Sequence, residues 1–355
     1  MKMPKSHTIA TAVLLSSILP LHADGLVVKP RSYEGSLEER AQSAMIVFTP
    51  GTEKKSAVQE LILKIRVEGD TEEFAWVVPL PSVPQTAKEN PKLFEELFRY
   101  VEARKRPKPK ARPLLAFGGA KNAEATPDAK VEVISREIVG SFDVAVVKEK
   151  VGGGLNEWLE KEGYQPVGGA GSKRVLGHYR DKGYVFACVK VSEAALDAPG
   201  GAELHPLRFT FETGGRDGIY FPMRLTGLQS ERFDVNLYIF YGAWLNDRIN
   251  GHGYVHRGFE LNWRDYDSKR CKPNAGKTWS APEHDPYLAG YASKIPTLTR
   301  YFQKRHPGER FYLTNILARN LRPADVRDWR DDLWMYPYYT DPAFVPYDLR
   351  GGEVE

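Results

Sequence analysis

Two histidines lie four residues apart in the stretch GHGYVH, at His252 and His256. An offset of four puts two side chains on one side of a helix, and an even offset puts them on one face of a strand. Two imidazoles on one face begin a metal site, which His284 or a carboxylate such as Asp247 would complete. The glycine-rich context disfavours a helix, and the chain has no HExxH pattern. The alternative to metal binding is that His252 and His256 are ordinary surface or hydrogen-bonded histidines.

A dense aromatic run near the C-terminus is the second candidate site. It contains Trp329, Trp334, Tyr336 and Tyr338, with prolines between and after them. Such side chains stack on sugar rings or anchor a partner protein. Aromatic residues and prolines also cover a sheet efficiently, and the sequence favours this packing role over ligand binding.

Patterns for catalysis are missing from the sequence. There is no GxSxG nucleophile elbow, and the adjacent carboxylates Asp331 and Asp332 would diverge on a helix. The stretches GGGLNEW and GGAGSKR are glycine-rich, but neither has the lysine and hydroxyl spacing of a phosphate loop. Both are therefore interpreted as turns, and we predict no catalytic residue and no cofactor.

The chain has two cysteines, Cys188 and Cys271. Cys188 lies in YVFACVKV, which is typical of a strand, and Cys271 lies in SKRCKPNAGK, which is typical of a loop. In an exported protein the two could form a disulfide. The alternative, which the contexts favour, is a buried free thiol and a separate, more accessible one.

The first 23 residues have the features of a secretory signal peptide. Lys2 and Lys5 precede an apolar stretch at 8–19, and Ala23 offers a small residue for cleavage. An uncleaved membrane anchor is the alternative. Because no later segment approaches the length of an apolar span, we expect no stable membrane span after the leader is removed, and a periplasmic or secreted location.

The charge of the mature chain gives no reason to bind nucleic acid. The leader holds two of the 50 basic residues and no acidic one, which leaves 48 − 46 = +2. A nearly neutral, mixed surface lacks the basic footprint of nucleic-acid-binding proteins.

Strand patterns dominate the first half of the mature chain. The segment at 61–69 alternates apolar and polar residues, which indicates an antiparallel strand with one wet face. FAWVVPL at 74–80 follows after a glycine turn, so the two are predicted to form a hairpin. Prolines end the second arm, because proline cannot donate to a strand ladder. A helix is predicted at 91–104, capped by Asn90.

The second half has similar strand patterns. Strands are predicted at 131–147, and another hairpin is predicted at 207–228, whose second arm also ends near a proline. A short helix is predicted directly after the three glycines of GGGLNEW, and a further helix is predicted to begin near Pro296. The predicted fold class is α+β, mostly antiparallel sheet in two β-rich halves, each with a packed helix, and an aromatic-rich tail. The expected divisions are a signal peptide at 1–23, a β-rich half at 24–115, a flexible linker at 116–130, a second half at 131–259 and a C-terminal extension at 260–355.

Several motifs in this order resemble an exported bacterial family known as domain of unknown function 2330. The matching segments are ADGLVV, ERAQSAMIVF, FAWVVPLPSVP with LFEEL, VEVISREIVGSFDVAVV, LNEWLEKEGY, YVFACVKV, HPLRFTF and IYFPMRLTGL. The resemblance spans roughly residues 23–245 and implies export and a shared β-rich fold. It brings no catalytic residues.

Taken together, the sequence favours an exported binding or interaction module over an enzyme. The expected partner is an envelope protein or a polysaccharide. The alternative is a hydrolase acting on a cell-wall or polysaccharide substrate, whose paired carboxylates or nucleophile the sequence does not reveal.

Overall fold

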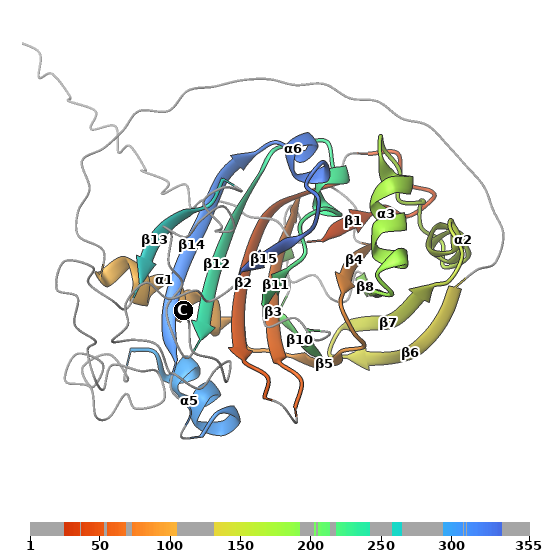
Figure 1. Ribbon diagram of the computed structural model, residues 1–355. Helices are drawn as coiled ribbons and strands as arrows, with labels where there is room; N and C mark the ends of the chain where they lie inside the picture. Colours follow the sequence, from red (N-terminus) through yellow and green to blue (C-terminus); the bar gives the residue numbers. More distant parts are fainter. Residues whose placement is uncertain are drawn as a thin grey trace, which may run out of the picture.

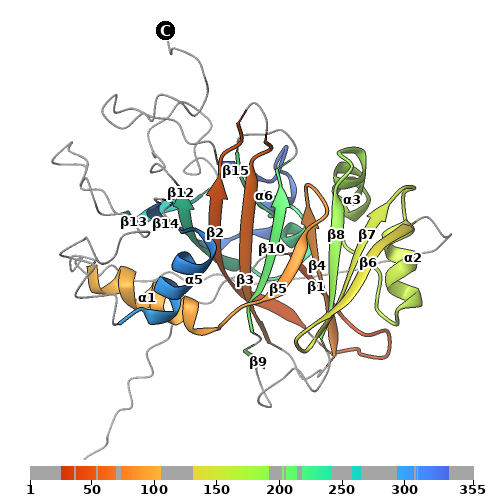
Figure 2. The ribbon, with the colours of Figure 1, turned by 90° about the horizontal axis from the view of Figure 1, so that it is seen from below.

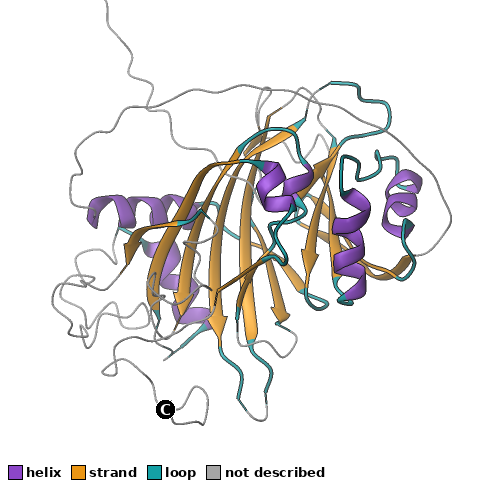
Figure 3. Cartoon of the chain, turned by 45° about the horizontal axis from the view of Figure 1, so that its top comes forward, coloured by secondary structure: helices purple, strands orange, loops and turns teal. Residues whose placement is uncertain are grey.

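The computed structural model describes most of the chain between residues 25 and 335. The gaps in this range are residues 36, 53–54, 69–72, 105–130, 192–201, 204, 214–217, 242–257, 265–293, 308 and 310. Figure 3 shows the strands in the middle of the molecule and helices on both sides of them.

The larger sheet has eight strands. Its order is β13 (Glu260–Arg264), β14 (Tyr312–Leu321), β12 (Phe233–Tyr241), β2 (Glu38–Thr49), β3 (Val58–Glu68), β10 (Leu207–Glu212) and β5 (Gln85–Lys88), with β9 (Ala202–Glu203) also pairing with β3. β2 and β12 run parallel, and the other pairs in this sheet are antiparallel.

The smaller sheet has five antiparallel strands, and a separate two-stranded ribbon lies near it (Figure 1). The order in the smaller sheet is β1 (Leu26–Val28), β4 (Phe74–Leu80), β8 (Val185–Val191), β7 (Phe142–Glu149) and β6 (Val131–Val139). The ribbon pairs β11 (Ile219–Phe221) with β15 (Leu333–Met335). The protein is therefore α+β with mostly antiparallel sheet, as the sequence predicted.

The helices lie in two groups. α1 (Lys92–Arg104) and α5 (Pro296–Arg305) pack side by side on the outer face of the larger sheet (Figure 2). α2 (Gly154–Lys161) and α3 (Ser172–Asp181) lie beside the smaller sheet, while α6 (Pro323–Arg327) contacts the 3₁₀ turn η2 (Thr226–Leu228). Among the described residues, no helix combines the length and apolar character needed to cross a membrane.

The helix predicted at 91–104 is present as α1, and the backbone N–H of Lys92 donates to Asn90 Oδ1 at 3.0 Å. The two strands at 131–147 form the β6–β7 hairpin, whose turn places Gly140 at φ 64°. Two helices were missed, α3 and the short α6. GGAGSKR was interpreted as a turn, but α3 begins directly after Gly171, because glycine accepts the left-handed conformation at that entry.

Both predicted proline-ended hairpins are wrong, because their arms belong to different sheets. β3 pairs with β2 and β10, while β4 pairs with β1 and β8. Likewise β10 lies in the larger sheet and β11 in the ribbon. The physical reason is burial: all seven residues of β4 are buried, so this strand needs cover on both faces, which a half-exposed hairpin would not provide.

Pro79 is tolerated in β4 near the end of its pairing with β1. Among the described residues the last β1 pair is Leu26 with Val77, and the described strand partner of Pro79 is Phe186 on β8. A proline without an N–H is tolerated there.

Two apolar clusters hold the layers together. One lies between the sheets, and the other lies between the larger sheet and the helices α1 and α5. β3 contributes Leu61 and Leu63 to the first and Ile62 to the second. The face of β3 that was predicted to be wet is therefore covered by helices around Ile62.

Each sheet takes strands from both sides of residues 116–130. β2 and β3 join β10, β12 and β14, and β1 and β4 join β6, β7 and β8. The two halves seen in the sequence do not correspond to the two sheets, and the predicted linker itself lies outside the described residues.

Candidate functional site

A buried carboxylate, Asp332, is the centre of the first polar cluster. Tyr179 donates to its Oδ1 at 2.9 Å and Tyr220 donates to its Oδ2 at 3.1 Å. The backbone N–H groups of Met223 and Arg224 also donate to Oδ1, each at 2.9 Å. Because these donors come from α3, from β11 and from the turn after β11, the carboxylate ties three segments to the start of β15.

Its neighbour Asp331 points to other partners. It contacts His178 Nε2 at 3.2 Å and forms an ion pair with Lys182. The two adjacent carboxylates thus have different partners, and they lie in the turn before β15 rather than on a helix.

His178, Asp331 and Asp332 together offer ligand atoms within 4.8 Å of one another. One imidazole and two carboxylates are a chemically reasonable set for a metal ion. Asp332 already accepts four hydrogen bonds, however, and Asp331 is paired with Lys182. The donors already present satisfy both carboxylates. We therefore interpret Asp332 and its four donors as a structural brace, a buried polar cluster that links separate segments of the chain.

Burial dominates the electrostatics of the brace. It raises the pKa of Asp332, while hydrogen bonds from the backbone of Arg224 and Met223 and from Tyr179 act against that rise. Burial is also the main cause that raises the pKa values of Tyr179 and Tyr220, with the nearby charge of Asp332 adding to it. Both phenols therefore remain hydrogen-bond donors.

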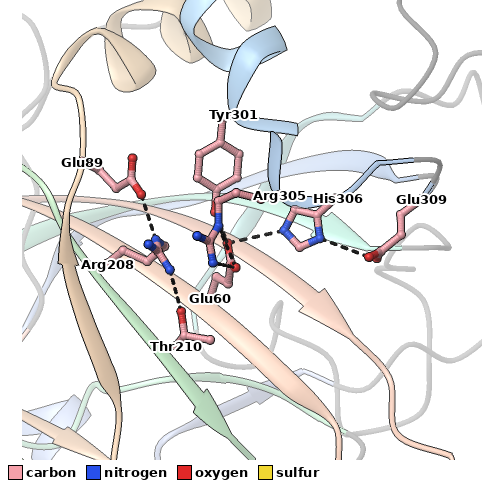
Figure 4. A network of polar contacts seen from close by, with 8 residues as sticks. All are labelled: Glu60, Glu89, Arg208, Thr210, Tyr301, Arg305, His306 and Glu309. Atoms are coloured by element: carbon pink, nitrogen blue, oxygen red, sulfur yellow. Dashed lines mark hydrogen bonds and ion pairs between the residues drawn. The ribbon is translucent and has the colours of Figure 1, made fainter. Parts of the chain in front are cut away.

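The second polar cluster surrounds Glu60 on β3, beneath α5 (Figure 4). Tyr301 donates to Glu60, and Arg305 Nε lies 2.9 Å from Glu60 Oε1. His306 Nε2 lies 3.4 Å from Glu60 Oε2, and its Nδ1 lies 3.4 Å from Glu309. Nearby, Figure 4 shows Arg208, which donates to Glu89 at 2.8 Å and to Thr210 at 2.9 Å.

Glu60 is ionised in this setting. Burial would raise its pKa, but hydrogen bonds from His306, Arg305 and Tyr301 outweigh burial and lower the pKa to about 2. The cluster therefore fastens α5 to the sheet through a buried negative charge, which requires the positive charge of Arg305 beside it.

A third feature is the Ser141–His205 contact, where Ser141 Oγ and His205 Nε2 are 3.2 Å apart. Ser141 lies in the β6–β7 turn, and the His205 ring packs edge-on against Phe142 at 4.6 Å. A hydroxyl within hydrogen-bond reach of an imidazole is the first requirement of a serine nucleophile.

The exposed edge of the smaller sheet is the fourth feature. Within the described residues β6 pairs with β7 alone, and its centre is exposed. Three large apolar side chains stand on it: Ile138, Val133 and Ile134 are 74%, 49% and 37% exposed. Two of its charged side chains are already paired at the surface, Glu132 with Lys150 at 2.7 Å and Arg136 with Asp143 at 2.6 Å.

The structure packs the described members of the predicted aromatic site against the core. Trp334 is buried on β15, with its ring 5.0 Å from that of Tyr220, and Trp329 is partly buried against the main cluster. This arrangement fits the packing interpretation. Tyr336 and Tyr338 lie outside the described residues.

Of the other predicted site residues, Cys188 lies in the described part of the chain and the rest lie outside it. His252 and His256 lie outside the described residues, as do His284 and Asp247. Cys188 is buried on β8, and burial raises the pKa of its thiol. Cys271 lies outside the described residues, so its pairing with Cys188 stays a prediction.

Sequence reasoning missed the residues at the centres of both clusters. Glu60 carried one usable signal, since it is an acidic residue on the same strand face as the apolar Ile62. Asp332 carried a weaker signal, an acidic residue directly before the buried strand β15. Nothing in the local sequence indicates the donors to these two carboxylates, which lie 108 or more residues away.

The fold and its polar clusters define a two-sheet α+β protein braced by buried carboxylates. The chain belongs to the family DUF2330, described as an uncharacterized protein conserved in bacteria, which matches residues 40–279. The resemblance noted in the sequence is thereby confirmed.

Comparison with curated proteins gave no match. Among solved structures, the chain is similar to the baculovirus protein P35, with 10% identity and a TM-score of 0.33. That similarity covers 66% of this chain and 72% of P35.

Proposed function

We propose that this protein is exported and acts by binding, with β6 as the strand edge that receives an extended segment of another envelope protein. The observation that carries the proposal is the exposed, apolar edge of β6. An edge strand offers unpaired backbone N–H and C=O groups, and proteins commonly recognise extended peptides by adding them to such an edge.

The composition of β6 supports strand addition. Lysine and proline are common protections of a strand edge, and VEVISREIV has neither. Of its three charged residues, Glu132 and Arg136 are paired with Lys150 and Asp143. A bulge between Val133 and Ser135 interrupts the register with β7 and leaves four pairs beyond Ser135, from Arg136 to Val139. Because Trp334 is packed inside, an apolar peptide fits the exposed surface better than a polysaccharide does.

Export is supported by the leader at 1–23, with its basic start and short apolar stretch. The mature chain is expected to begin at Asp24 and to be recovered from the periplasm or the cell surface.

Site-specific photocrosslinking in the bacterium tests the proposal. A photoreactive residue at Ile138 is expected to give one discrete adduct with an envelope protein, on a chain that begins at Asp24. Phe98 is the matched control, since it is apolar and 37% exposed, and its helix α1 lies at the opposite end of the molecule from β6 (Figure 2). Adding Val133→Lys should remove most of the adduct, because a charge on the edge opposes strand pairing. Equal adducts from positions 138 and 98 would refute the role of β6.

The Ser141–His205 contact favours one alternative, a hydrolase with Ser141 as its nucleophile. A fluorophosphonate probe distinguishes the two functions. The binding proposal expects no labelling above that of Ser141→Ala. Labelling of the wild-type chain that disappears in Ser141→Ala would favour the hydrolase.

A further inference from the structure

Arg224 is a buried cation that lacks a hydrogen-bond partner for much of its guanidinium. It is 4% exposed, and neither Nε nor Nη1 has a partner among the described residues. Its backbone N–H donates to Asp332, but no hydrogen bond joins its guanidinium to that carboxylate. Burying an unpaired charge is costly, so such an arginine indicates an anion that comes from elsewhere.

The elements around Arg224 meet at the beginning of α3. Arg224 stands two residues before η2, and η2 packs tightly on two sides. A Cβ placed on Gly227 would lie 2.4 Å from Arg327 N, and one placed on Gly169 would lie 3.3 Å from Leu228 O. η2, which begins two residues after Arg224, therefore lies beside both the glycine-rich entry of α3 and the end of α6.

The entry of α3 is built from glycines and has no side-chain cap. Gly169 and Gly171 have φ values of 92° and 87°, and no side chain caps the helix. The first N–H groups of a helix have no partner within the helix, and the helix dipole favours negative charge at this end. Beside Gly171 lie Arg327 Cδ and Arg174 Nη2, at 3.1 and 3.7 Å from the position of an added Cβ.

Two arginines contact one carboxylate at this corner, and a third, Arg224, acts on it through its charge. Asp328 forms an ion pair with Arg174, and Arg327 Nε lies 3.8 Å from it. The hydrogen bond from Arg174 is the main cause that lowers the pKa of Asp328, and the charges of Arg327 and Arg224 add to this effect. Arginine side chains outnumber the single carboxylate, Asp328, that is paired with them here.

We propose that this corner binds an oxyanion group, a phosphate or a carboxylate of a ligand, between Arg224, Arg174, Arg327 and the first N–H groups of α3. Guanidinium groups suit both anions, because they donate two parallel hydrogen bonds in one plane. The site is independent of the β6 edge, and its ligand would be a second binding partner of the protein.

Thermal unfolding of the mature chain tests the site. Inorganic phosphate and sodium acetate are each compared with sodium chloride at matched ionic strength, at neutral pH. We expect at least one of the two oxyanions to raise the Tm by roughly 2–5 °C near saturation. A rise with phosphate alone assigns a phosphate group, and a rise with acetate assigns a carboxylate.

Three variants locate the effect. Arg224→Met should abolish the oxyanion-dependent rise while keeping a Tm in chloride equal to or above that of the wild type, because it removes an unpaired buried charge. Arg174→Gln changes a largely exposed residue that poses little risk to folding, and it should weaken the rise. Arg99→Gln, on the exposed Arg99–Glu95 pair of α1, should leave it unchanged.

Two results would overturn the proposal. One is a wild-type Tm that is the same in chloride and in both oxyanions, or that rises equally in Arg224→Met. The other is a lower Tm of Arg224→Met in chloride, which would mean that the rest of the chain already pairs this arginine.

Discussion

Asp332→Ala is expected to lower the free energy of unfolding by ~4–5 kcal/mol, the largest effect of any single substitution considered for this chain. The substitution removes the acceptor for four donors: the hydroxyls of Tyr179 and Tyr220 and the backbone N–H groups of Met223 and Arg224. Each buried donor left without a partner costs ~1–3 kcal/mol, and only part of that cost is recovered by relaxation. Urea unfolding followed by tryptophan fluorescence measures the loss.

Asp332→Asn distinguishes the contribution of the hydrogen-bond acceptor at position 332 from that of its negative charge. The amide oxygen can still accept from Tyr179, Met223 and Arg224, and Tyr220 can donate to Pro79 O, which lies 3.0 Å away. We therefore expect a loss of less than half that of Asp332→Ala. Asp331→Asn, on the partly exposed neighbour, should cost ~1 kcal/mol or less. Equal losses from Asp332→Asn and Asp332→Ala would contradict the account, because they would make charge rather than hydrogen bonding the decisive property.

The pKa of Asp332 adds a pH dependence to this comparison. Burial raises the pKa in the folded state, so wild-type stability falls as pH rises from the unfolded-state pKa, near 3.8, toward the folded-state value. Asparagine does not ionise. The stability gap between wild type and Asp332→Asn should therefore narrow over that rise in pH.

Glu60→Gln is expected to lower the free energy of unfolding by ~2–3 kcal/mol at neutral pH. Arg305 would lose its buried counter-charge, and the hydrogen bonds from Tyr301 and His306 would weaken. Glu309→Gln is the matched control, since Glu309 contacts the same histidine but its side chain is 45% exposed, and it should change stability by less than ~0.5 kcal/mol.

The effect of Glu60→Gln should disappear in acid. The pKa of Glu60 is lowered from 4.5 to about 2, so its charge stabilises the fold fully above pH 4.5 and progressively less as pH falls toward 2. Chemical unfolding of both proteins across this range should give two curves that converge. A gap that stays constant from pH 6 to pH 2 would show that the ionised form of Glu60 is not what fastens α5 to the sheet.

Features encoded within about twenty consecutive residues could be predicted from the sequence. α1 follows from Asn90 at its cap and its apolar stripe, and the β6–β7 hairpin follows from two alternating strands around Gly140. Such signals are short-range, because capping, periodicity and turn chemistry involve near neighbours along the chain.

Strand pairing across the chain could not be predicted in the same way. Alternation in β3 and the aromatic run of β4 suggested a hairpin because the two are adjacent in sequence. In the fold, β4 needs burial on both faces and pairs with β8, about 110 residues away, while β3 pairs with β10. Which distant strand covers a buried one depends on the assembly of the whole core.

The polar clusters show the same limit at the level of single residues. Asp332 and Glu60 are ordinary acidic residues in the sequence, and their roles come from donors on α3, β11 and α5. By contrast, Trp334 is conspicuous in the sequence, and the fold uses it for packing. The two braces hold α3, β15 and α5 in place, which leaves the edge at β6 and the arginine corner at α3 as surfaces that can meet other molecules.

Hydrogen exchange of the β6 amides tests the central claim most directly. The free protein is compared with its complex with the partner identified by crosslinking, without the crosslink. Strand addition predicts that amides of Val131–Val139 pointing away from β7 exchange at least about tenfold more slowly in the complex, while those of α1 are unchanged. Protection elsewhere on the protein, with β6 exchanging at the same rate free and bound, would contradict the proposed binding mode.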